Sequence, residues 1–94
     1  MSIKQVGIIG CGRIFKKHFD AIKSLSGKFK LIACADLDKK IINEKVHSSE
    51  IRKYQSYIDM LRCEELDVVC ILVPSGLHSK IAQDCVDKVK TVVV

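Results

Sequence analysis

Two glycines that follow an apolar run are the residues best suited to bind a phosphate group. Residues 6–9 (VGII) have the composition of a buried strand, Gly10 and Gly12 come directly after it, and a helical pattern begins near Arg13. Gly10 permits a tight turn out of the strand. Gly12, which lacks a Cβ, lets a pyrophosphate approach the backbone at the positive end of the helix. The spacing therefore predicts a phosphate-binding turn, and the alternative is a plain turn between a strand and a helix.

A carboxylate that follows the next apolar run extends this prediction to a ribose. Asp36 lies 24 residues after Gly12 (36 − 12), close to the separation of about 20 at which an acid accepts hydrogen bonds from ribose hydroxyls. Asp36 and Asp38 together would repel a 2′-phosphate, which favours NAD over NADP, although two lysines at 39 and 40 moderate that preference. The alternative for Asp36 is a helix N-cap.

Strands alternate with helices along the whole chain. The apolar runs predict strands over residues 4–10, 29–35, 53–55, 67–73 and 91–94. Helical periodicity predicts helices over residues 13–25, 39–48, 57–63, where Ser56 is the cap, and 77–89. The first helix should turn Ile14, Phe15, His18, Phe19, Ile22 and Leu25 inward. This alternation predicts a doubly wound α/β domain with one parallel sheet, and 94 residues make one domain at most.

Composition and charge exclude several classes of function. Thirteen of the sixteen basic residues are lysines scattered along the chain and only five residues are aromatic, so the net charge of +5 indicates a solvated surface rather than a nucleic-acid site. The five cysteines show no zinc spacing, and we expect reduced core residues and no metal site. With no apolar stretch near 20 residues and no signal peptide, we expect a cytoplasmic protein without a membrane span.

Four segments resemble the N-terminal NAD(P)-binding domain of the Gfo/Idh/MocA oxidoreductases, which include glucose-fructose oxidoreductase and inositol dehydrogenase. They are VGIIGCGRIFKKHFDAI, LIACADLD, KYQSYIDML and DVVCILVPSGLHSKIAQDCV, and the resemblance spans essentially all 94 residues. It implies a Rossmann fold with NAD as the cofactor, NADP being the less favoured one. The third position of the G-x-G-x-x-G or A fingerprint holds Phe15, so the close packing that a small residue allows there must be arranged differently.

The resemblance also implies which residues contact the cofactor. Gly10, Gly12, Arg13 and Ile14 would hold the pyrophosphate. The segment PSGLH is similar to the T-P-x-x-x-H loop of the family, with Val73 where threonine is usual. By that likeness Pro74, Ser75, Leu77 and His78 would line the ribose and nicotinamide half. The alternative for His78 is a helix-start residue bonded to the backbone, and Cys11 is interpreted as a turn residue rather than a nucleophile.

The function that follows from the resemblance is that of an oxidoreductase. It would transfer a hydride between the nicotinamide and a hydroxyl of a sugar, polyol or nucleotide sugar. Residues 1–94 would be the N-terminal part of a longer enzyme. The catalytic lysine motif and the substrate domain, which would also carry any homo-oligomer contacts, would lie outside these residues, so no catalytic residue is expected here. The alternative is a non-catalytic regulatory module that responds to a nucleotide or to coenzyme A.

Overall fold

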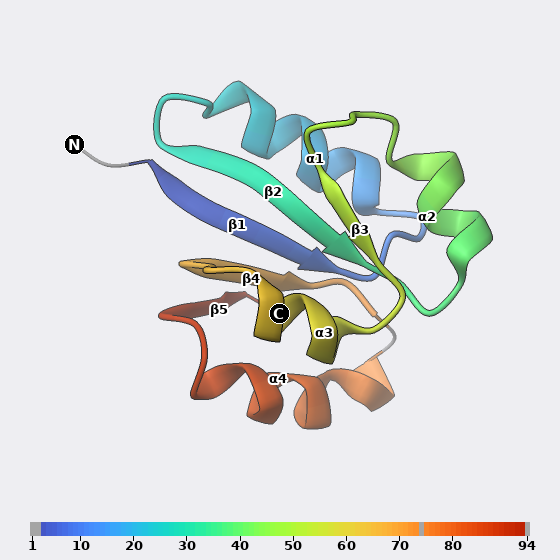
Figure 1. The fold of residues 1–94 in the computed structure, drawn as a ribbon, viewed down its shortest axis with the longest axis vertical. Coiled ribbons are helices and arrows are strands. Elements are labelled where there is room, and N and C mark those ends of the chain that lie inside the picture. Colours follow the sequence, from blue (N-terminus) through green and yellow to red (C-terminus); the bar gives the residue numbers. More distant parts are fainter. Residues whose placement is uncertain (1–2, 74, 94) are drawn as a thin grey trace.

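Five parallel strands form one sheet in the order β3-β2-β1-β4-β5 (Figure 1). The computed structural model describes residues 3–73 and 75–93. The strands are β1 (Lys4–Ile9), β2 (Phe29–Ala35), β3 (Arg52–Tyr54), β4 (Val68–Ile71) and β5 (Thr91–Val93). The helices are α1 (Phe15–Ser24), α2 (Lys39–Lys45), α3 (Tyr57–Cys63) and α4 (His78–Val86), and a 3₁₀ turn, η1 (Ser75–Leu77), precedes α4. The predicted doubly wound α/β fold is confirmed, and β1 lies where the strand order reverses.

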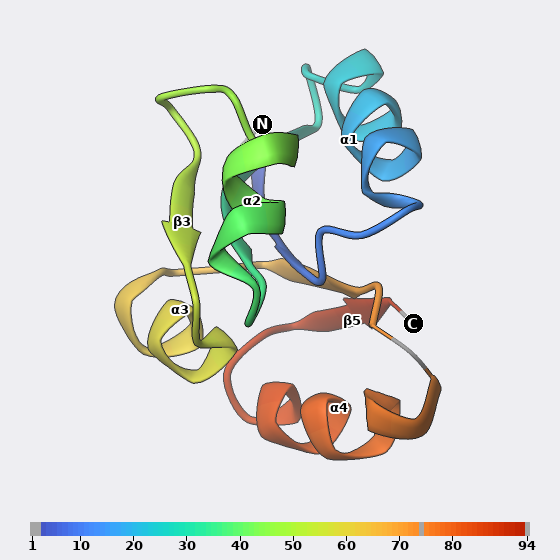
Figure 2. The same cartoon turned by 90° about the vertical axis from the view of Figure 1, so that its right-hand side faces the viewer.

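Helices cover both faces of the sheet, with α1 and α2 on one side and α3 and α4 on the other (Figure 2). Every residue of β4 is buried. Val68 and Cys70 belong to the core cluster under α1 and α2, whereas Val69 and Ile71 belong to the cluster under α3 and α4. Because successive side chains of a strand point to opposite faces, a continuous apolar run is what a strand covered on both sides requires.

The first helix differs from its prediction at both ends. Phe19 and Ile22 pack against the core as expected, but Ile14 and Leu25 are 47% and 48% exposed because they flank the helix rather than belong to its inner face. The residue at the third fingerprint position, Phe15, is 2% exposed and stacks on Phe19 with ring centroids 5.9 Å apart. The aromatic side chain thus fills the core beneath α1, where a small residue would allow closer packing.

Two other details of the fold depart from the sequence-based expectations. The helix predicted over residues 39–48 ends at Lys45, because Val46 is already extended with φ −108° and ψ 105°. Four of the five free cysteines are buried as expected, but Cys63 is exposed, because it is the last residue of α3 and lies on its outer side. None of the helices in residues 3–73 and 75–93 is long and apolar enough to cross a membrane.

Candidate functional site

The turn after β1 needs a glycine at its first position. Gly10 has a φ of +97°, which L side chains rarely adopt, and its N–H donates to the carbonyl of Ala35 at 2.7 Å. A Cβ on Gly10 would lie 2.9 Å from the carbonyl carbon of Leu72, so the backbone of β1 passes against the end of β4. A Cβ on Gly12 would meet no atom within 4 Å. The space in front of Gly12 is therefore open, as the approach of a phosphate to the backbone requires.

The carboxylate of Asp36 joins this turn to the end of β2. One of its oxygens, Oδ2, accepts the N–H of Cys11 at 2.8 Å, and the other, Oδ1, accepts the N–H of Asp38 at 2.8 Å. Each carboxylate oxygen has further acceptor capacity after one such bond. The alternative N-cap role belongs to Asp38 instead, whose side chain accepts the N–H groups of Lys40 and Ile41. The Asp36 side chain therefore does not cap α2, and it bonds instead to the backbone of the glycine turn.

Cys11 is held in the turn as a buried side chain. It is fully buried, and its thiol lies 3.9 Å from the carbonyl oxygen of Ala35. A hydrogen bond with Cys11, together with burial, raises the pKa of the neighbouring Cys34 thiol. A buried thiol in such a place has no access to a substrate, so the structure agrees with the interpretation of Cys11 as a turn residue.

A cavity of about 420 Å³ opens at the carboxyl ends of β1, β2 and β4, beside the glycine turn. Its lining residues are Ile9, Gly10, Gly12, Ala35, Asp36, Leu37, Gln55, Tyr57, Leu72, Val73, Leu77, Lys80 and Ile81. Most of these side chains are apolar, and the charged ones are Asp36 and Lys80. A cavity of this size with few polar groups, at a strand-order reversal, is typical of a nucleotide site in an α/β fold.

The structure brings together four of the predicted site residues around this cavity. Gly10, Gly12, Asp36 and Leu77 line it, whereas Arg13, Ile14 and His78 do not. Pro74 lies outside the described residues, as does the side chain of Ser75. The roles of these residues toward a ligand stay predictions.

His78 begins α4 and is bonded to the backbone, as its alternative interpretation expects. Its Nε2 lies 2.5 Å from the carbonyl oxygen of Val73. A carbonyl oxygen only accepts, so Nε2 carries the proton and donates it. The ring therefore ties the start of α4 to the residue that precedes the turn after β4.

Two polar residues that the sequence reasoning passed over, Tyr57 and Lys80, line the cavity, and Asp84 bonds to both. The hydroxyl of Tyr57 donates to Asp84 at 2.5 Å, and Lys80 Nζ lies 3.4 Å from the same oxygen. The hydrogen bond to Asp84, with burial, raises the pKa of Tyr57 to about 12, and the same bond holds the pKa of Asp84 below its usual range. The i,i+4 spacing of Lys80 and Asp84 was a readable signal for their pairing, but the approach of Tyr57 depends on how α3 packs beside α4.

These residues fit a dinucleotide on structural grounds alone. The open space at Gly12 admits a pyrophosphate, and the Asp36 oxygens retain acceptor capacity for ribose hydroxyls. Exposed apolar side chains of the lining, Leu37 and Leu77, offer a surface for a planar base. The described ranges 3–73 and 75–93 contain no group of three His, Cys, Asp or Glu side chains that could hold a metal ion.

Comparison with known proteins agrees with this fit. The family model for the Gfo/Idh/MocA oxidoreductases, described as an oxidoreductase family with an NAD-binding Rossmann fold, matches residues 4–94. No curated protein sequence matches the chain.

Solved structures of dehydrogenases share the fold. The WlbA dehydrogenase from Chromobacterium violaceum, crystallised with NADH and UDP-GlcNAcA, is 30% identical with a TM-score of 0.87 over 95% of this chain. The WlbA dehydrogenase from Bordetella pertussis, with the same two ligands, is 29% identical with a TM-score of 0.80 over 88% of it. The scyllo-inositol dehydrogenase from Lactobacillus casei is 24% identical with a TM-score of 0.84 over 97%, which shows the fold. The chain spans 27% of the length of each of these proteins.

The family match covers nearly the whole chain and agrees with the glycine turn, the strand order and the carboxylate at the end of β2. NAD is the cofactor of this family. The chain therefore belongs to the Gfo/Idh/MocA oxidoreductase family and has its NAD-binding Rossmann fold.

Proposed function

We propose that this chain is the cofactor domain of a longer enzyme that transfers a hydride between NAD and a hydroxyl of a sugar, polyol or nucleotide sugar. One observation carries the proposal. The glycine turn after β1 and the Asp36 carboxylate after β2 meet in a single cavity, joined by the Cys11 hydrogen bond. That juxtaposition supports a phosphate-binding role for the turn and a ribose-binding role for Asp36.

Each part of the cavity is proposed to contact one part of the dinucleotide. Gly10, Gly12, Arg13 and Ile14 would hold the pyrophosphate, and Asp36 would accept hydrogen bonds from the hydroxyls of the adenosine ribose. The turn after β4, with Pro74, Ser75, Leu77 and His78, would lie along the nicotinamide half. When bound, NAD supplies the carbon that accepts or gives the hydride, and the chain's own residues orient it.

Charge near Asp36 supports a preference for NAD over NADP. A 2′-phosphate would come close to Asp36 and to Asp38, and both carboxylates would repel it. Lys39 and Lys40 are exposed on the first turn of α2 and weaken this repulsion. We therefore propose a moderate preference rather than an absolute one.

The neighbours support the proposed substrate class. The two WlbA enzymes, whose structures hold UDP-GlcNAcA, are 30% and 29% identical to the chain, which supports a nucleotide sugar within the wider group of sugars and polyols. The chain spans 27% of their length, and we assign substrate binding and proton transfer to a further domain, which would also carry any homo-oligomer contacts. Five free thiols support a reducing compartment, so we propose a cytoplasmic enzyme.

Titration of the chain with NADH, NADPH and coenzyme A tests this proposal. We expect NADH to bind most tightly, and Asp36→Asn to weaken NADH by about tenfold or more, as expected for hydrogen bonds to a charged group. Asp38→Asn is the matched control, because it removes a nearby charge of the same type without touching the proposed ribose contact. Tightest binding of coenzyme A would favour the regulatory alternative, and NADH binding that is indifferent to Asp36→Asn would refute the ribose assignment.

A further inference from the structure

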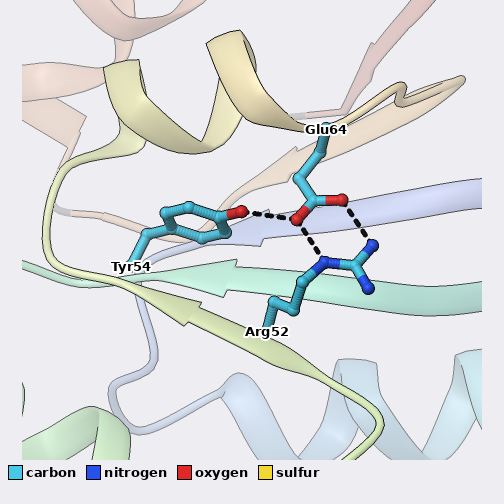
Figure 3. Close-up of polar contacts among 3 residues, drawn as sticks. All are labelled: Arg52, Tyr54 and Glu64. Atoms are coloured by element: carbon cyan, nitrogen blue, oxygen red, sulfur yellow. Dashed lines mark hydrogen bonds and ion pairs between the residues drawn. The ribbon is translucent and has the colours of Figure 1, made fainter.

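Glu64 is a nearly buried carboxylate some way from the proposed contacts with the cofactor. It follows α3 as its C-cap residue, and its side chain is 5% exposed. It accepts hydrogen bonds from the hydroxyl of Tyr54 at 2.5 Å and from two nitrogens of Arg52, Nε and Nη2 (Figure 3). Both donors come from β3, so one carboxylate holds the side chains of the first and last residues of this three-residue strand.

Stability alone does not explain this arrangement. A buried ion pair is often no more stabilising than apolar residues of similar volume, because desolvation of the charges offsets their attraction. Arg52 is 58% exposed, which weakens the pair further. The contact has a specific geometric effect, however, because it fixes the side chains of Tyr54 and Arg52 relative to the end of α3.

The strand that Glu64 holds also contacts Asp36. β3 lies at the edge of the sheet and pairs with β2, with Tyr54 opposite Ala35. The carbonyl oxygen of Tyr54 accepts the N–H of Asp36 at 3.0 Å. The next residue, Gln55, lines the cavity. The end of β3 therefore sets both the backbone position of Asp36 and part of the cavity wall.

The hydroxyl of Tyr54 adds a specific anchor to the packing and backbone pairing of this strand end. The neighbouring residues of β2 on the same face, Ala33 and Ala35, are small and buried, and Tyr54 is a partly buried residue beside them. Burial, followed by the hydrogen bond to Glu64, raises the pKa of Tyr54 to about 12. The hydroxyl thus stays protonated and bonded to Glu64 across the neutral pH range.

We propose that Glu64 is a positioning residue for cofactor binding, which fixes the end of β3 through the Tyr54 hydroxyl and thereby holds Asp36 toward the ribose. The proposal rests on the proposed function for the role of Asp36. It adds a residue that does not line the cavity and that the sequence reasoning did not single out.

Tyr54→Phe is the sharpest test, because it removes the hydroxyl and leaves the ring and the backbone pairing of β3. We expect Tyr54→Phe and Glu64→Gln each to weaken NADH binding by about three- to tenfold, within the range for residues that act through a neighbour. Glu65→Gln, an exposed glutamate at the next position, is the matched control and should bind NADH as the unaltered chain does. Thermal unfolding identifies any variant that is not folded. If Glu64→Gln does not fold, NADH binding by Tyr54→Phe decides the test.

A double-mutant comparison separates positioning from general weakening. If Tyr54 acts through Asp36, the loss of NADH affinity caused by Tyr54→Phe should shrink to less than about twofold in an Asp36→Asn background. Unchanged NADH affinity in Tyr54→Phe would overturn the proposal. So would a loss of affinity by Tyr54→Phe that is the same factor in the original chain and in Asp36→Asn.

Amide hydrogen exchange in the absence of cofactor tests the same link without relying on the proposed function. Tyr54→Phe should speed exchange of the Asp36 amide by about threefold or more, while the Gly10 amide, which donates to Ala35, changes less. If Asp36→Asn leaves NADH affinity unchanged, the ribose assignment fails, and the exchange rate of the Asp36 amide alone then decides whether Glu64 positions this residue. An unchanged rate would overturn the proposal.

Discussion

Two alanine substitutions in the glycine turn should separate stability from cofactor binding. In Gly10→Ala, the side chain would have to adopt a φ near +97°, which costs roughly 1–2 kcal/mol for an L residue. Its Cβ would also lie 2.9 Å from the carbonyl carbon of Leu72 and 3.0 Å from the carbonyl oxygen, and backbone atoms, unlike the end of a flexible side chain, cannot shift cheaply. The overlap adds roughly 1 kcal/mol or more, as overpacking does elsewhere. We therefore expect a loss of about 2–4 kcal/mol in the free energy of unfolding.

In Gly12→Ala, the same atom enters open space. No atom lies within 4 Å of the added Cβ and φ at this position is not positive, so the free energy of unfolding should stay within about 1 kcal/mol of its original value. The Cβ would nevertheless occupy the place proposed for the pyrophosphate, so NADH affinity should fall by about tenfold or more, as expected for lost contacts to a charged group.

Urea unfolding and NADH titration of both variants measure these effects. The expected result is a crossed pattern, in which Gly10→Ala loses stability and Gly12→Ala loses affinity at nearly unchanged stability. A Gly10→Ala variant as stable as the original chain would contradict the strain argument. A stable Gly12→Ala variant that binds NADH with the original affinity would contradict the placement of the pyrophosphate.

Three further predictions concern the titratable groups. The pKa of Glu64 is held below its ordinary value of 4.5, chiefly by Arg52, so this carboxylate stabilises the fold above that pH and the contribution is lost as pH falls through the lowered pKa. Urea unfolding between pH 3 and 6, roughly the window of carboxylate titration, should show that the free energy of unfolding falls less steeply with pH in Glu64→Gln than in the original chain. An identical fall in both would count against the hydrogen bonds described. Tyr54 and Tyr57 are the only tyrosines and both have a pKa raised to about 12, so phenolate absorbance should stay low through pH 10 while the chain is folded, and a rise centred at pH 10 would disprove both contacts. Cys63 is the exposed cysteine, so a thiol reagent should modify one group rapidly and the buried four slowly, and Cys63→Ser should remove the fast phase; rapid modification of a second thiol would contradict the buried positions.

Local patterns were sufficient to predict most of the elements. The strand over residues 29–35 and the helix over residues 57–63 have the predicted bounds, because Asp36 follows the first and Ser56 caps the second with its side chain accepting the N–H of Asp59. The strand predicted over residues 67–73 is shorter, Val68–Ile71, because pairing on both sides ends before the apolar run does. Apolar composition predicts burial, but the pairing partners decide where a strand stops.

Contacts within the site were less predictable because they depend on strand register. The sequence pattern allowed Asp36 as a helix N-cap, but Asp38 caps α2 because this helix begins at Lys39. The register of β1 and β2, with Ile9 opposite Ala35, brings the Asp36 carboxylate to the Cys11 amide, 25 residues away in the chain. A contact between residues so far apart in the chain leaves no signal in the local sequence. The Glu64 contact with β3 likewise depends on how α3 packs.

The hydrogen bonds of Asp36 also explain how a small domain could bind a flexible dinucleotide. Before any ligand arrives, the carboxylate is fixed by two backbone N–H groups and its own amide by the carbonyl oxygen of Tyr54. Ordering of this side chain and of the glycine turn is thus achieved during folding, and binding does not have to offset that loss of entropy. A ribose would add its hydrogen bonds to the remaining acceptor capacity of a carboxylate that is already in place. The same logic predicts that residues which fix Asp36 from a distance affect affinity for the cofactor more than their own contribution to stability suggests.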